Sequence, residues 1–351
     1  MTTAASFTDQ TSGTISPLLV NTVRIFGLSS VLLGVVFVIN NFLIFGFDLP
    51  GFIASIGGEG ALGTDKPEQP FGAMATIFGW VQTLLVLLAV ALPGVHVMRG
   101  GSLAVDAAWM DALASYLVRA AFWAVLLTGI TDAVISFLRV ENLHAVLFGE
   151  KLATQLGLSS WRGVFVHLPM ILLAGLIALR DKSVSVVWLT LLVVIAEMLI
   201  VLARFIFAYE QTFMGDLVRF WYAALFLFAS AYTLKEEGHV RVDVLYAGLR
   251  QRTKCWLNFS GSLLFGLPLC WIVMARGMWG KSSLINSPMF NFETSMSGFG
   301  MYVKYLMAAF LIVFALTMLI QFTAYMFASL AELEDGTADR ADAKAAEAGG
   351  N

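Results

Sequence analysis

The chain has 351 residues, of which 59% are hydrophobic and 13% are charged, and its formal net charge is -3 at pH 7. A soluble domain carries about one quarter charged residues, so this composition excludes a soluble protein and indicates a polytopic membrane protein. No basic face is interleaved with aromatic residues, which excludes nucleic acid as a partner. The cysteines, Cys255 and Cys270, lack metal-ligand spacing, so neither a disulfide framework nor a zinc site is predicted.

Eight apolar segments are long enough to cross a membrane, because a bilayer core of ~30 Å needs about 20 apolar residues per helix. The N-terminal MTTAASFTDQTSGTISP lacks the basic region and apolar core of a signal peptide, so no cleaved leader is expected. The predicted spans lie near residues 20–46, 71–97, 108–138, 161–180, 184–208, 215–234, 254–278 and 302–330. The third carries polar residues at helical spacing in DAAWMDALASYLVRAA, so we expect it to begin as an interfacial helix.

Lys and Arg in the short loops predict the orientation of the spans. Both termini are then cytoplasmic, since the number of spans is even, and they form tails over 1–19 and 331–351. The second tail, with ELEDGTADRADAKAAEAGGN, is polar and Ala/Gly-rich, so it is expected to be disordered. The basic residues that mark the cytoplasmic connections follow the fourth span (Arg180 and Lys182) and the sixth (Lys235, Arg241, Arg250, Arg252 and Lys254).

An internal repeat emerges when the sequence is shifted by 137 residues without gaps. The shift places GGSLAVDAAW over EGHVRVDVLY, so that Asp106 falls on Asp243. The fold class predicted from this is all-α, with eight transmembrane helices arranged as two parallel four-helix repeats over 20–182 and 183–330. The external loop 47–70 has no counterpart in the second unit and is interpreted as an insertion in the first.

The second unit carries three stretches of note: ARFIF over 203–207, Asp216 at the start of the next helix, and FLFASAYTLKEEGHVRVDVLY over 226–246. Together they resemble the small membrane subunit, DctQ type, of the tripartite ATP-independent periplasmic (TRAP) transporters. The segment FETSMSGFGMYVKYLMAAF is similar to the polar entry into that family's last helix. The sequence departs from the family pattern at EQTFM (210–214), where a Pro-Trp is usual, and at Ser102, which replaces the histidine in the first unit.

The resemblance implies a small permease or scaffold subunit of a sodium-coupled TRAP transporter, in the inner membrane of a bacterium with a periplasm. In that family a large membrane subunit of the DctM type carries the substrate and sodium sites. A periplasmic solute-binding protein delivers the substrate, which the resemblance suggests is an organic carboxylate. The expected partners are these two proteins and the membrane lipids. The chain is expected to bind no cofactor.

Charge is densest at the end of the sixth span, in TLKEEGHVRVDVLY (233–246). His239 and Asp243 stand four residues apart and share a face if the segment is helical. Three interpretations stay open: a titrating pair, a charged dock for the large subunit, and ion pairs that fix the turn at the membrane surface. The candidate interface or structural charge network consists of Lys235, Glu236, Glu237, Gly238, His239, Arg241 and Asp243, together with Arg204 and Glu197.

Glu197 lies near the middle of the fifth span, where an ionisable group costs at least ~2.5 kcal/mol. It is therefore expected to face protein or water, as a hydrogen-bonded carboxyl that fixes helix packing or as a coupling-ion ligand or proton relay. Arg204 and Arg219 are its candidate partners. His167 and Lys304 fall near outer helix ends, where snorkelling to the headgroups explains them.

No constellation in the sequence supports catalysis, since HExxH, CxxC and phosphate-binding loops are all lacking. The alternative to an accessory subunit is a self-sufficient secondary carrier built from two parallel repeats. Such carriers have interrupted helices at matching positions of their two halves. Pro93, Pro169 and Pro268 do not coincide at the 137-residue shift, which disfavours the carrier.

Overall fold

The computed structural model describes residues 15–51, 72–183, 187–235, 246–295 and 299–349. All regular structure in these ranges is helical, with two short π-helical turns, η1 and η2. The elements are α1 (Pro17–Phe47), α3 (Ala73–Met98), α4 (Leu103–Val140), α5 (His144–Leu156), α6 (Ser159–Arg162), η1 (Gly163–His167), α7 (Leu168–Arg180), α8 (Val187–Phe207), α9 (Thr212–Lys235), α11 (Gln251–Gly261), η2 (Ser262–Gly266), α12 (Leu267–Gly277), α13 (Asn286–Phe290), α14 (Lys304–Glu334) and α15 (Thr337–Gly349).

Eight helices of this set are long and apolar enough to cross a membrane, as predicted from the sequence. Six are single helices, and two are composite: α6–η1–α7 over Ser159–Arg180 and α11–η2–α12 over Gln251–Gly277. Their ends lie within a few residues of the predicted ones, because the apolar run that a bilayer requires also fixes the length of each helix. The predicted all-α, eight-helix class is therefore confirmed.

Proline explains both π-helical turns. Pro169 and Pro268 each occupy the second position of the α-helix that follows a π-turn. Proline has no backbone N–H and its ring clashes with the carbonyl four residues earlier, which here is Phe165 or Leu264. Both carbonyls lie within the π-turns, where the wider winding relieves the clash.

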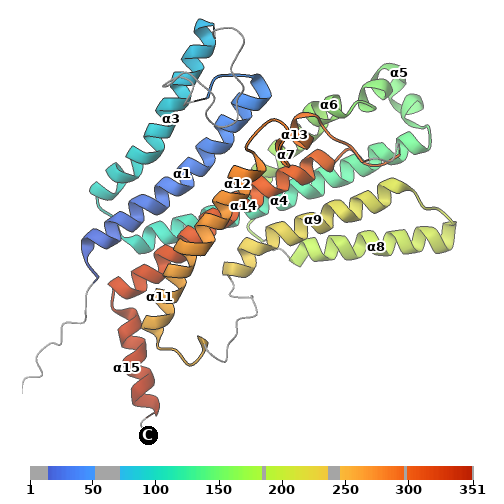
Figure 1. The fold of residues 1–351 in the computed structure, drawn as a ribbon. Helices are drawn as coiled ribbons and strands as arrows, with labels where there is room; N and C mark the ends of the chain where they lie inside the picture. Colours follow the sequence, from blue (N-terminus) through green and yellow to red (C-terminus); the bar gives the residue numbers. More distant parts are fainter. Residues whose placement is uncertain (1–14, 52–71, 184–186, 236–245, 296–298, 350–351) are drawn as a thin grey trace, which may run out of the picture.

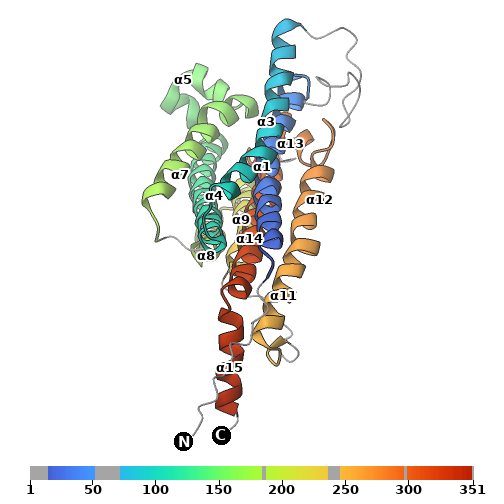
Figure 2. The same ribbon diagram turned by 90° about the vertical axis from the view of Figure 1, so that its left-hand side faces the viewer.

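Helix α14 is the centre of the bundle. It packs against α4 and α9, against the composite helix α11–η2–α12, and against α1 (Figures 1 and 2). Large side chains such as Leu319 and Phe327 are fully buried along it. Because α4 belongs to the first half of the chain and α14 to the second, the two halves share one hydrophobic core.

The outer helices pair locally. Helix α1 pairs with α3, α4 with α7, and α8 with α9. Helix α4 packs in addition on α9, so it is wedged between α7 and the second half of the chain (Figure 1). The division into two repeats related by duplication stays a prediction.

The C-terminal segment was expected to be disordered from residue 331, and this prediction is wrong. Helix α14 continues to Glu334, and α15 follows and projects from the end of the bundle (Figure 2). The Asp342 carboxylate accepts hydrogen bonds from the backbone N–H groups of Gln251 at 2.6 Å and Arg252 at 3.2 Å. These are first-turn donors of α11 that have no partner within their own helix, so the polar tail is ordered by serving as their cap.

The start of α4 packs one face against the core, at Leu103, Ala107, Met110 and Ala114, while Trp109 on another face is exposed. Its expected place at the membrane interface stays a prediction. The polar residues that suggested an interface, such as Asp111, point toward α14, where Gln321 donates to Asp111 at 3.3 Å. Small residues permit this approach, so the polar spacing reflects helix packing.

Gly129 of α4 lies against Trp221 of α9. A Cβ atom there would lie 2.5 Å from Trp221 Nε1, which donates to the Val125 carbonyl at 3.2 Å. We expect Gly129→Ala to lower the stability by about 1–3 kcal/mol through overpacking. Thermal unfolding in detergent measures the loss. Gly94→Ala is the matched control, since a Cβ there meets nothing within 4 Å, and an equal loss in both variants would contradict this account.

Candidate functional site

A buried ion cluster lies where α4, α6–η1 and the segment before α14 meet. At its centre is Asp132 of α4, whose side chain is 0% exposed. Its Oδ1 accepts from Arg162 Nη1 at 2.7 Å and lies 3.1 Å from His167 Nε2, and its Oδ2 accepts from the Tyr302 backbone N–H at 2.7 Å. The carboxylate thus joins both halves of the chain.

Aromatic rings complete this cluster. The Tyr305 hydroxyl lies 2.6 Å from His167 Nδ1. The histidine tautomer with hydrogen on Nε2 therefore accepts from Tyr305 and donates to Asp132. Two guanidinium groups lie against the Tyr302 ring, with Arg162 4.1 Å and Arg139 4.6 Å from its centroid. Cation–π attraction of this kind grows when the groups are desolvated.

A second acid fixes the same segment from the other side. Asp216, in the first turns of α9, accepts from the Met301 backbone N–H at 3.1 Å through Oδ2. Its Oδ1 lies 3.4 Å from Arg219. Arg139 adds a hydrogen bond of 2.7 Å to the Gly300 carbonyl. The turn before α14 is thus held between α4 and α9 by its backbone as well as by its rings.

At the opposite end of α4, Asp106 forms a second buried cluster. Arg24 of α1 donates from Nε to Asp106 Oδ2 at 2.9 Å, its Nη2 forms an ion pair with the same oxygen at 2.8 Å, and His96 Nε2 lies 3.0 Å from Oδ1. Arg24 also donates to the carbonyl of Gly101, whose φ of +114° favours glycine. This cluster ties α1, α3 and α4 together.

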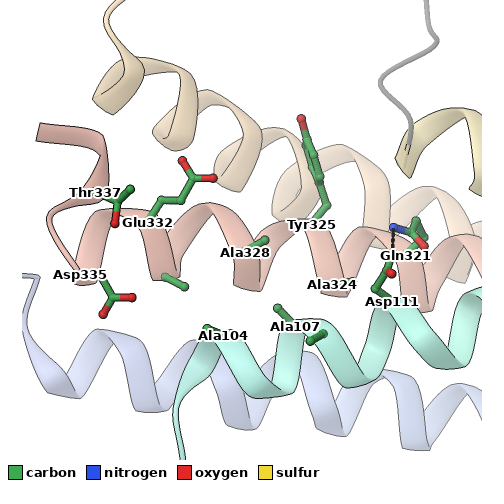
Figure 3. A pocket seen from close by; sticks show the side chains of 12 residues that line it. Ala104, Ala107, Asp111, Gln321, Ala324, Tyr325, Ala328, Glu332, Asp335 and Thr337 are labelled. Atoms are coloured by element: carbon green, nitrogen blue, oxygen red, sulfur yellow. Dashed lines mark hydrogen bonds between the residues drawn. The ribbon is translucent and has the colours of Figure 1, made fainter. Parts of the chain in front are cut away.

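A groove separates the first turns of α4 from the last turns of α14 (Figure 3). Its cavity volume is about 450 Å³. Alanines of both helices line its length, and carboxylates stand at both ends, with Asp111 at one and Glu332 and Asp335 at the other (Figure 3). The walls of the groove therefore consist largely of small residues, and its ends carry negative charge.

The predicted charge network is only partly placed by the structure. Lys235 is the last residue of α9, while Glu236, Glu237, Gly238, His239, Arg241 and Asp243 lie outside the described residues. Arg204 pairs with Glu210 at 3.3 Å on the surface, not with Glu197. Next to this pair, Tyr209 donates to Glu141 at 2.7 Å, and burial together with this hydrogen bond raises the pKa of Tyr209 to about 12.

Glu197 contradicts the expectation that it fixes helix packing. Its side chain is exposed on α8 and makes no hydrogen bond or ion pair with the part of the chain that the structure describes. Arg219, the other proposed partner, pairs with Asp216 instead. The remaining interpretations of Glu197 all require a group from outside these residues.

His167 corrects a second sequence interpretation. It is not at the headgroups but 0% exposed, between Asp132 and Tyr305. Asp132 and Arg162 were not singled out from the sequence at all. The sequence does contain a signal for this pair: an acid and a base lie in consecutive spans, each within a few turns of the loop that connects them. Lys304, by contrast, is about half exposed and pairs with Glu293 at 3.2 Å.

The chemistry that these clusters can perform is limited. Their carboxylates already accept from arginine, histidine or backbone donors, and Arg162 also donates twice to the Leu156 carbonyl, at 3.0 and 2.6 Å. In the described ranges, no group of three or more His, Cys, Asp or Glu residues is placed to hold a metal ion. The arrangement fits a role in holding helices together.

The second half of the chain is similar to a known family of transporter components. Residues 190–332 match the family model described as "Tripartite ATP-independent periplasmic transporters, DctQ component". The match begins in α8 and ends in α14, so the first four membrane helices lie outside it. No curated protein and no solved structure matches the chain. The resemblance of the second unit is thereby confirmed, and DctQ proteins are transporter components rather than enzymes.

The buried cluster makes a strong prediction for stability. Asp132→Ala leaves Arg162 as a buried charge without its carboxylate, so we expect a loss of about 3–5 kcal/mol. Glu293→Ala, which breaks the exposed pair with Lys304, is the control and costs ~0–1 kcal/mol. Both are measured by thermal unfolding in detergent. Similar small losses in the two variants would show that Asp132 is not central to the fold.

Proposed function

We propose that this chain, whose residues 190–332 carry a DctQ domain, is the small membrane subunit of a TRAP-type secondary transporter in the inner membrane of a bacterium with a periplasm. It supports a large membrane subunit that imports an organic carboxylate by sodium symport. A periplasmic solute-binding protein delivers the substrate to the pair. The first four helices extend the scaffold of the DctQ domain.

One observation carries this proposal: the DctQ match extends over four consecutive membrane helices whose buried charges are used within the chain. Asp216, in the first turns of α9, accepts a hydrogen bond from the Met301 N–H with one carboxylate oxygen and pairs with Arg219 through the other. Asp132 of α4, which lies outside the matched region, likewise has donors on both oxygens. A solute pathway needs polar groups free to replace the hydration shell of the solute, and these groups are engaged in structure.

The groove between α4 and α14 also favours an accessory role. An organic carboxylate is an anion, and the groove presents Asp111, Glu332 and Asp335 (Figure 3). Like charges repel, most strongly where water is partly excluded. The groove is therefore a poor binding site for such a solute.

Asp106 supports the structural interpretation of the GHVRVD segment. The 137-residue shift places Asp106 on Asp243 and Gly101 on Gly238. In the first unit, Asp106 pairs with Arg24, and Gly101 provides the carbonyl for the same arginine. By analogy, the matching charges of the second unit have a structural or docking role rather than a role in binding solute.

The second candidate is a self-sufficient carrier, which one observation favours. Two membrane helices are interrupted by π-turns, and interrupted helices form the binding sites of many carriers. In this structure, however, η1 contacts the start of α14, where His167 meets Tyr305, whereas η2 packs against α14 near Phe322, more than four helical turns away. The two interruptions do not meet at a common site, so the accessory subunit is the better conclusion.

Reconstitution tests the proposal. We expect the chain to co-purify from detergent with a larger hydrophobic subunit, and liposomes that contain the chain alone to take up no organic carboxylate. Uptake is expected when the large subunit, the binding protein and a sodium gradient are all supplied. Labelled dicarboxylates, monocarboxylates and sugar acids serve as probes.

Liposomes with the large subunit alone are the matched control for this reconstitution. Carboxylate uptake by the chain in the absence of any other protein would establish the carrier instead. A chain that purifies without a second membrane protein from its native membrane would also contradict the proposal.

A further inference from the structure

Glu197 lies at the midpoint of α8. The helix runs from Val187 to Phe207, so Glu197 is ten residues from each end. At a rise of ~1.5 Å per residue, that distance is about 15 Å, which is half of a ~30 Å hydrocarbon core. The carboxyl group is therefore at the level of the bilayer midplane if α8 spans the membrane.

The side of α8 that carries Glu197 has no cover within the described chain. The helix packs against α9, and its fully buried residues are Leu189 and Ala196. Thr190, Val194, Glu197 and Val201 follow one another at spacings of three or four residues on the exposed side. Val194 is 54% and Val201 46% exposed. We call these four residues the α8 stripe.

A carboxyl group at this depth needs a partner. An acid at the centre of a membrane helix costs ~2.5–3.5 kcal/mol on insertion scales, and lipid chains offer no hydrogen-bond donor. The described residues supply none, since Arg204 is engaged by Glu210 and Arg219 by Asp216. A donor from another polypeptide at the same depth would remove this cost.

A second copy of this chain is a poor source of that donor. A two-fold contact through the α8 stripe places the same patch on both sides, so that Glu197 approaches Glu197. Two carboxylates at the membrane centre repel each other. The remaining apolar and small polar residues of the stripe offer no cation that would compensate.

We propose that the α8 stripe docks a transmembrane helix of the large membrane subunit, and that this helix presents a basic or amide side chain to Glu197 at the bilayer midplane. The inference rests on the proposed function and adds the contact face to it. Apolar neighbours such as Val194 and Val201 pack against the partner helix, while Glu197 fixes its depth and rotation. Polar contacts have this role in membrane helix association.

Substitution of Glu197 tests the docking. Glu197→Leu is expected to leave the isolated chain as stable as the wild type or more so, because the carboxyl has no partner within the described chain. The same variant is expected to retain the large subunit about three- to thirty-fold less well in detergent, the range set by one interhelical hydrogen bond. Glu197→Gln, which still hydrogen-bonds, is expected to lie between the two.

Glu210→Gln is the matched control for this series. It removes an exposed carboxylate near the outer end of α8, paired with Arg204, and it is expected to leave retention of the large subunit unchanged. Equal retention in wild type and Glu197→Leu would overturn the docking inference. If the wild-type chain retains no large subunit at all, the proposed function fails, which is a separate outcome.

Cysteine cross-linking locates the contact independently of its strength. Val194→Cys and Val201→Cys are expected to form disulfides with cysteines placed along the spans of the large subunit, near the membrane centre. Leu87→Cys, 62% exposed on α3, is the control on a different helix. Cross-links from Leu87→Cys but not from the stripe, or cross-links between two copies of this chain through the stripe, would overturn the inference.

Discussion

The structure depends on the neutralisation of one buried carboxylate. Asp132 is removed from water, and an ion in that position is tolerated only when charge and hydrogen bonds compensate it. Arg162 and His167 supply the charge and one donor from η1 and its preceding turn, and the Tyr302 backbone supplies another from the second half of the chain. The three segments must therefore meet at one point. That requirement sets how α4 and α14 cross and how the first four helices attach to the DctQ domain.

The same compensation explains why the buried charges of this protein are poor candidates for a transport pathway. A group that binds and releases an ion or solute must exchange partners at low cost, whereas Asp132, Asp106 and Asp216 hold partners on rigid helices and on the backbone. Breaking such a pair leaves a buried charge uncompensated, at a cost of about 3–5 kcal/mol. These ion pairs and hydrogen bonds thus hold the helices in fixed positions relative to one another.

The sequence predicted the elements of the fold better than their contacts. The eight spans were found within a few residues because membrane thickness imposes a length that hydrophobicity records directly. The DctQ resemblance was found from local motifs such as ARFIF and GHVRVD. The partnership of Asp132 with Tyr302 joins residues 170 positions apart, and it depends on helix rotations that uniformly apolar spans do not encode. The sequence does not predict the order of the C-terminal tail for a similar reason. The tail shows no apolar face in its sequence, and its Asp342 is held by backbone donors of α11.

Glu197, like Asp132, is an acid on a membrane helix and needs hydrogen-bond partners. Unlike Asp132, it has none in the described part of its own chain. Both are acids on membrane helices, but one is enclosed by partners of its own chain, and the other faces outward from the middle of α8. An acid that stabilised only the isolated chain would be enclosed, as Asp132 is. An acid that is costly in the isolated chain and satisfied in a complex favours assembly, because association removes the penalty of the exposed group. With the docking proposed above, the position of Glu197 favours the complex over the free subunit.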